Sequence, residues 1–254
     1  MRPQTVFRIA WLVTVCAAAG CGEESRFFIV QNQVPQEGCV IPGDRSDVYR
    51  GEGRLDVSLV GETQPLAYRM FPLLQNDLPG AGGKGAAEAN RLTIKGFRVR
   101  VGLGTDAPPA ARQLFDALAA DELGRRFLAY DEPWSGTLDP GGSTATAGVT
   151  VVPGEIARRL KASGLFQNVP RLNLMISVRA LGARTAGDLD TPEFHYPIEV
   201  CDGCLVAFGG SCPLAVRRFA GNACNVAQDE PVDCCLDGGA ARCPAPIMTS
   251  GSGR

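Results

Sequence analysis

Residues 171–200 read RLNLMISVRALGARTAGDLDTPEFHYPIEV, and this stretch predicts two strands joined by a hairpin. Apolar side chains take every second position from Leu172 to Ala180 and again from Phe194 to Val200. A period of two is typical of strands that bury one face and expose the other. The segment between the two runs, 182–192, contains two glycines and ends at a proline, which is a turn signal. We therefore expect strand, hairpin and strand over 171–200.

The same alternation extends towards the N-terminus. It occurs in 54–60, 66–70, 91–103 and 144–152, and an apolar run at 27–30 adds a further strand. Within 91–103 the apolar phase slips by one position at Lys95-Gly96, and a glycine at such a slip predicts a β-bulge. About seven or eight strands of this kind predict a mainly β fold, in the form of an antiparallel, immunoglobulin-like β-sandwich.

Two helices are expected among these strands. Residues 109–123 place Leu114, Phe115 and Leu118 at helical spacing. Pro153-Gly154-Glu155 opens a second, shorter helix, because proline is favoured in the first helical turn. In both helices the apolar stripe indicates a face that covers the core.

The composition changes along the chain in a way that predicts five segments. Seven cysteines lie between Cys201 and Cys243, among glycine, aspartate and proline and without sustained periodicity. That texture indicates a stapled extension and not a second conventional core. We expect a signal peptide at 1–20, a lipidated tether at 21–25, a β-sandwich domain at 26–200, a disulfide-stapled extension at 201–243 and a flexible tail at 244–254.

The N-terminal segment has the layout of a secretory signal peptide. Arg2 and Arg8 lie in its first eight residues, and the apolar run Ile9 to Ala19 follows them. This run is too short to span a bilayer. The stretch Ala18-Ala19-Gly20-Cys21 resembles a bacterial lipobox, with Ala18 in place of the usual larger aliphatic residue. The resemblance implies cleavage before Cys21 and attachment of lipid, including palmitate, to that cysteine. The alternative is ordinary cleavage, with Cys21 left free or paired.

The overall composition is that of an ordinary packed globule, with 45% hydrophobic residues, 20% charged residues and a formal net charge of −2. These values exclude disordered and collagen-like classes and predict no nucleic-acid partner. The chain has one histidine, which removes most histidine-based catalysis. This residue, His195, lies on the strand face opposite Phe194 and Tyr196, and the sequence matches no nucleophile or carboxylate to it. We expect it to be a solvated strand residue.

Motifs for catalysis and cofactor binding give no positive signal. Neither G-x-S-x-G nor H-E-x-x-H occurs. Residues 80–85 match G-x-G-x-x-G, but they lie in a proline- and glycine-rich loop outside any strand–turn–helix unit. We therefore expect no catalytic residue, no cofactor and no metal ligand, and thus a non-enzymatic protein. A weak calcium site stays open in the acidic hairpin 182–192, at Asp188, Asp190 and Glu193.

Eight cysteines are left when Cys16 and Cys21 are set aside. Their number is even, and the signal peptide directs the chain to an oxidising compartment, so we expect four disulfides. A bond between the neighbours Cys234 and Cys235 would be strained, which still leaves many pairings open. The eight candidates are Cys39, Cys201, Cys204, Cys212, Cys224, Cys234, Cys235 and Cys243.

One pairing follows from the count alone. Seven of the eight cysteines lie in 201–243, and seven is odd. If all eight pair within the chain, Cys39 must therefore bond to one of these seven. Such a bond would join the extension to the region of the first strand, and could stabilise the folded state by up to about 5 kcal/mol in the chain-entropy model.

Two other interpretations of the cysteines stay open. Cys201-Asp202-Gly203-Cys204 is a C-x-x-C that follows a predicted strand, as in redox motifs. Residues 205–210 offer too short a run before two glycines to form the helix that activates the first thiolate in such motifs. A zinc site could combine this pair with Cys234-Cys235, but export disfavours thiolate ligands.

The chain resembles the uncharacterised cysteine-rich lipoproteins of myxobacteria and similar high-GC Gram-negative bacteria. The resemblance rests on Ala18 to Cys21, on the strand-hairpin-strand of 171–200 and on YPIEVCDGCL at 196–205. It implies a place in the cell envelope, at the outer membrane, through the lipid on Cys21. We expect a structural or binding role towards another envelope protein or a surface ligand. The alternative is a thiol-disulfide oxidoreductase that uses Cys201 and Cys204.

Overall fold

The computed structural model describes residues 26–59, 66–80, 89–214, 218–238 and 240–243. Several expectations lie outside this part of the chain. They are the signal peptide at 1–20, the tether at 21–25 with Cys21, the tail at 244–254 and most of the glycine-rich motif at 80–85.

The fold is mainly β and contains three short α-helices within the described residues. The strands are β1 (Phe27–Asn32), β2 (Gly53–Asp56), β3 (Tyr68–Met70), β4 (Pro72–Asn76), β5 (Leu92–Leu103), β6 (Ala129–Leu138), β7 (Ser143–Thr146), β8 (Val149–Val152), β9 (Arg171–Arg184), β10 (Gly187–Asp190), β11 (Phe194–Cys201), β12 (Val206–Ser211), β13 (Val232–Asp237) and β14 (Ala240–Arg242). The helices are α1 (Pro109–Ala120), α2 (Glu122–Leu128) and α3 (Gly154–Ala162), and three single 3-10 turns are η1 (Glu37–Cys39), η2 (Val57–Leu59) and η3 (Leu165–Gln167).

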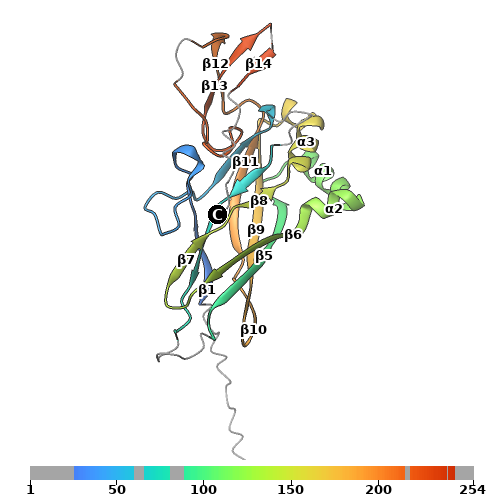
Figure 1. The fold of residues 1–254 in the computed structure, drawn as a ribbon. Helices are drawn as coiled ribbons and strands as arrows, with labels where there is room; N and C mark the ends of the chain where they lie inside the picture. Colours follow the sequence, from blue (N-terminus) through green and yellow to red (C-terminus); the bar gives the residue numbers. More distant parts are fainter. Residues whose placement is uncertain (1–25, 60–65, 81–88, 215–217, 239, 244–254) are drawn as a thin grey trace, which may run out of the picture.

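The described strands form four sheets. The largest has six strands in the order β2-β11-β9-β5-β6, with β10 paired to β9. The other three are β1-β4-β7, β3-β8 and β12-β13-β14. The last of these belongs wholly to the cysteine-rich extension and lies at one end of an elongated molecule, whereas β10 lies at the opposite end (Figure 1).

The strand, hairpin and strand predicted over 171–200 are confirmed. β9 and β11 pair antiparallel, with Phe194 opposite Val178 and Cys201 opposite Arg171, and β10 extends the hairpin between them. The bulge predicted at Lys95-Gly96 is also present, because the register of β5 against β6 and β9 shifts between Ile94 and Gly96. A Cβ on Gly96 would lie 2.5 Å from the carbonyl oxygen of Glu132, so only glycine fits at this position.

The expectation of an antiparallel sandwich over 26–200 is wrong for one strand pair, because β2 runs parallel to β11, with Gly53 opposite Ile198 and Asp56 opposite Cys201. In the extension, for which the sequence predicts no strand direction, β12 also runs parallel to β13. No tight turn links the strands of either pair, so hairpin geometry does not impose the antiparallel direction.

Three predicted elements end earlier or split. The strand expected at 54–60 ends at Asp56 and continues as η2. The strand expected at 144–152 becomes β7 and β8, because its antiparallel partner is itself interrupted at Phe71, between β3 and β4. The helix expected at 109–123 ends at Ala120, where Asp121 becomes extended and its carboxylate accepts the backbone N–H of Gly124 at 2.9 Å, which caps α2.

Side chains from three sheets and two helices share one core. Phe27 comes from β1, Met70 from β3, Phe97 from β5 and Ile176 from β9, and all four are buried. α1 and α3 add Phe115, Leu118, Ile156 and Leu160 to the same cluster, which confirms that their apolar faces cover the core. Within the described residues, none of the helices is long and apolar enough to cross a bilayer.

The two ends of the long axis carry different parts of the chain. β1 begins near the β9–β10 hairpin, where a Cβ on Gly182 would lie 3.1 Å from the ring of Phe27. β1 ends at Asn32, whose Nδ2 donates to Oη of Tyr196 at 2.9 Å, on the side of the cysteine-rich extension (Figure 1). The chain therefore enters the described fold at the end opposite to the extension.

Candidate functional site

All eight cysteines of the described chain are paired in disulfides. The bonds are Cys39–Cys224, Cys201–Cys204, Cys212–Cys235 and Cys234–Cys243. Cys39 is thus bonded into the extension, as the odd count predicts. Cys234 and Cys235 belong to different disulfides, so the zinc site that would have used them as thiolates is not formed.

Besides the Cys39–Cys224 bond, polar contacts hold the extension against β2 and β3. The backbone N–H of Asp229 donates to the carbonyl of Arg54 at 2.8 Å, and the backbone N–H of Arg54 donates to Oδ1 of Asp229 at 2.9 Å. Oη of Tyr68 donates to the same carboxylate. Gln228 adds a second reciprocal pair, because its side-chain amide exchanges hydrogen bonds with the backbone N–H and carbonyl of Arg69.

Burial dominates the electrostatics of this junction. Desolvation raises the pKa of the Asp229 carboxyl, and the nearby Arg50 guanidinium opposes that shift only in part. The pKa of Tyr68 is raised by its own burial and by the Asp229 charge, and that of Tyr196 is raised by burial. A polar cleft of about 180 Å³ lies over the group, lined by Arg50, Arg54, Glu199 and Asp229 among others. The junction is a buried, hydrogen-bonded contact between domain and extension.

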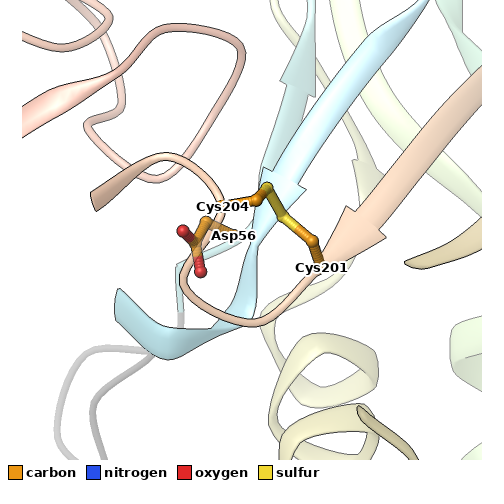
Figure 2. Close-up of side chains that lie close together, drawn as sticks. All are labelled: Asp56, Cys201 and Cys204. Atoms are coloured by element: carbon orange, nitrogen blue, oxygen red, sulfur yellow. A yellow bond between two sulfur atoms is a disulfide. The ribbon is translucent and has the colours of Figure 1, made fainter. Parts of the chain in front are cut away.

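A second cluster lies where β11 passes into the extension. It contains Asp56 at the end of β2 and the Cys201–Cys204 disulfide (Figure 2). A carboxylate oxygen of Asp56 and the two sulfur atoms all lie within 4.8 Å of one another. Within the described residues, it is the one group of three cysteine, histidine or acidic side chains close enough to share a metal ion. Because both sulfurs are bonded to each other, they are not thiolate ligands in this state.

Asp56 is the residue of this cluster that sequence reasoning missed. The alternation in 54–60 predicts it on the solvated face of a strand, but its side chain is fully buried. The loop after β11 covers that face and turns two backbone N–H groups towards the carboxylate, and η2, which follows β2, supplies a third. Gly203 and Leu205 donate at 2.7 Å each and Ser58 donates at 2.9 Å. No local pattern could have shown this, because the donors come mostly from a segment about 150 positions away.

The two cysteines of the pair have different environments. Cys201 is the last residue of β11 and is 1% exposed, with Sγ 3.6 Å from the carbonyl oxygen of Leu55. Cys204 is exposed, whereas the other seven described cysteines are buried or half-buried. The residues that follow form β12, so the absence of an activating helix predicted for this motif is confirmed. Any reactivity of the pair must come from accessibility and not from a helix dipole.

His195 is exposed on β11, as predicted, but it has a neighbour that the sequence could not identify. Ser177 lies directly opposite on β9, and its Oγ is 3.1 Å from Nδ1 of His195. The pair stands on the solvated face of the sheet. The acidic residues near the hairpin are engaged with cations there, because Asp188 pairs with Lys95 and Glu193 pairs with Arg100. These ion pairs compete with a calcium ion for the same carboxylates.

Comparisons with known proteins assign no family. No family model matches the chain, and no curated protein matches it. Among solved structures, the chain is similar to a protein from Archaeoglobus fulgidus at 10% identity and a TM-score of 0.33, over 56% of this chain and 90% of that one. A similarity of this strength carries no argument about fold or function.

Proposed function

We propose that this chain is an exported lipoprotein of the cell envelope with a structural or binding role. A lipid on Cys21 would hold it at the outer membrane, and its partner would be another envelope protein or a surface ligand. The observation that carries the proposal is an asymmetry of the molecule, in which the chain enters at one end and most of the exposed large apolar side chains lie on the extension or on the loop bonded to it.

The exposed apolar side chains are unevenly distributed. Of the eight large hydrophobic residues exposed in the described chain, six lie on the extension or on the loop bonded to it through Cys39–Cys224. The extension contributes Phe208, Phe219 and Leu236, and the loop contributes Val40, Val48 and Tyr49. Apolar side chains gathered on one part of a surface mark interaction sites more often than scattered ones do.

The disulfides support the location. Bonds with sequence separations of 185, 23 and 9 residues persist only in an oxidising compartment, such as the periplasm or the cell surface. If residue 21 carried a lipid, the chain would lead from the membrane into β1, at the end of the molecule away from the extension (Figure 1). The extension would then face away from the membrane, where a partner could reach it.

We also propose an immunoglobulin-like β-sandwich for residues 26–200, with 201–243 as a separate stapled extension. The support is the single core to which β1, β4, β3, β8 and the six-stranded sheet all contribute. The parallel β2–β11 pair would be an addition to that architecture.

The lipid anchor is tested by producing the full chain in a Gram-negative host that is fed an alkyne-tagged palmitate. We expect the label in the wild type and in Cys16→Ala, and its loss in Cys21→Ala. Intact masses of the membrane-extracted protein should show the same pattern. An unlabelled wild type, or a labelled Cys21→Ala variant, would contradict the anchor.

The binding surface is tested by photo-crosslinking in living cells. A photoreactive amino acid replaces Phe208 or Leu236 on the extension, and the matched control replaces Leu123, which is exposed on α2. We expect a discrete crosslinked partner from the two extension positions and none from Leu123. Equal crosslinking from all three positions would contradict a binding surface on the extension.

A further inference from the structure

The Cys201–Cys204 disulfide differs from the other three in what it constrains. Its two cysteines are three residues apart, whereas the other bonds join residues separated by 185, 23 and 9 positions. The loss of unfolded-state entropy caused by a crosslink grows with the loop that it closes. By this measure Cys201–Cys204 stabilises the fold least of the four.

The loop that it closes is already held by Asp56. The buried carboxylate accepts the backbone N–H groups of Gly203 and Leu205, one on each side of Cys204. Leu205 is itself buried, and its carbonyl accepts the backbone N–H of Val232 at 2.8 Å. The same loop conformation is therefore fixed at both ends without the sulfur–sulfur bond.

The surroundings also suit both oxidation states. Cys204 is exposed, so an incoming thiolate can reach its sulfur, whereas Cys201 is buried and cannot be attacked from solvent. In the reduced pair the thiol of Cys201 would have an acceptor in place, because the carbonyl oxygen of Leu55 lies 3.6 Å from its sulfur. A disulfide with one exposed cysteine, in a loop that other contacts already hold, has the features of a labile bridge and not of a structural one.

We propose that Cys201–Cys204 is a redox-active pair that exchanges two electrons with a dithiol protein of the envelope. The partner's thiolate attacks Sγ of Cys204, a mixed disulfide forms with Cys204, and the sulfur of Cys201 leaves and takes up a proton. The partner's second thiol then loses its proton and attacks the partner's first sulfur in the mixed disulfide. Cys204 leaves as a thiolate and takes up the second proton. The partner ends as a disulfide and this chain as a dithiol, and the reverse sequence reoxidises it.

Asp56 acts in this scheme as a positioning residue. It keeps the loop in place in both states, and its negative charge lies within 4.8 Å of the sulfur that must leave as a thiolate. A nearby negative charge disfavours a thiolate, and a leaving thiol of higher pKa leaves more slowly. The carboxylate therefore slows exchange with any attacking thiol while it holds the loop in place. The proposal does not depend on the lipid anchor or on the binding surface of the extension.

The test titrates the purified full chain, in detergent and without denaturant, with dithiothreitol. Free thiols are trapped with N-ethylmaleimide, counted by intact mass and located by peptide mapping. We expect two labels on Cys201 and Cys204 at reductant concentrations at least tenfold below those that open the other three bonds. The double variant Cys201→Ser/Cys204→Ser is the matched control and should gain no label in that range. Opening of all four bonds together, or of another bond first, would overturn the proposal.

The role of Asp56 is tested with Asp56→Asn, and Asp202→Asn serves as the control. Asp202 is an exposed acid of the same loop, so its replacement removes a charge without removing the buried acceptor. We expect Asp56→Asn to speed reduction by dithiothreitol about three- to tenfold and to lower the thiol pKa of the reduced pair, measured from thiolate absorbance. Asp202→Asn should change both by less. An unchanged thiol pKa in Asp56→Asn would overturn the electrostatic role, because loosening of the loop alone would not move it.

Discussion

Oη of Tyr68 lies 2.9 Å from Oδ1 of Asp229, a residue 161 positions further along the chain. The bond joins a strand of the domain to the cysteine-rich extension, and both partners are buried. Tyr68 also lies 3.1 Å from the hydroxyl of Tyr196, which in turn accepts from Asn32. A buried polar chain of this kind is stabilising only while every member has its partners, so it makes the junction sensitive to single substitutions.

Tyr68→Phe should destabilise the protein by about 1–3 kcal/mol, because it leaves the buried Asp229 carboxylate without one of its donors. Urea unfolding measures the loss. Tyr49→Phe is the control, since Tyr49 is 59% exposed. Equal stability of the two variants would show that the hydroxyl of Tyr68 contributes nothing to the junction.

The raised pKa of Asp229 predicts that the stability of the protein falls as the pH rises. Burial raises the folded-state pKa of this carboxyl above its ordinary value of 3.8, so the folded state binds the proton more tightly than the unfolded state does. Its contribution to stability is therefore fully present below about pH 4 and declines as the pH rises through the folded-state pKa. The variant Asp229→Asn has no carboxyl at this position, so its stability does not depend on protonation there. The stability of the wild type relative to Asp229→Asn should fall as the pH is raised from 4 towards neutrality, measured by urea unfolding at each pH.

The two disulfides at the ends of the size range should differ in their effect on stability. Loss of Cys39–Cys224, whose partners are 185 residues apart, should cost about 5 kcal/mol in the chain-entropy model. Loss of Cys201–Cys204 should cost at most about 2 kcal/mol in the same model, and less because Asp56 already holds the loop. Thermal unfolding of the two double serine variants checks the order. A larger loss in Cys201→Ser/Cys204→Ser would contradict it.

Gly53→Ala should destabilise the protein by about 1–3 kcal/mol through overpacking. A Cβ at this position of β2 would collide with the hydroxyl and ring of Tyr68. Gly51→Ala is the matched control, because a Cβ there would meet nothing within 4 Å. Urea unfolding of both variants measures the difference, and a neutral Gly53→Ala would mean that Tyr68 moves aside at no cost.

Features that depend on neighbouring positions can be predicted from the amino-acid sequence alone. The alternation in 171–181 identifies β9 because the side chains of a strand point to opposite faces at every step. The phase slip at Gly96 identifies the bulge for the same reason. The parity of the cysteine count placed the bonding partner of Cys39 in the extension, since parity depends on a number and not on geometry.

Which distant segments meet is fixed by the folding of the whole chain and by no local pattern. The tertiary structure selected Cys224 as the partner of Cys39, made β2 run parallel to β11, and buried Asp56 under a loop that the local pattern leaves in solvent. Each of these is a contact between segments more than a hundred residues apart, which no period of two or 3.6 records. The physical reason is that a buried carboxylate or a strand edge is satisfied by whichever donors the folded chain brings to it.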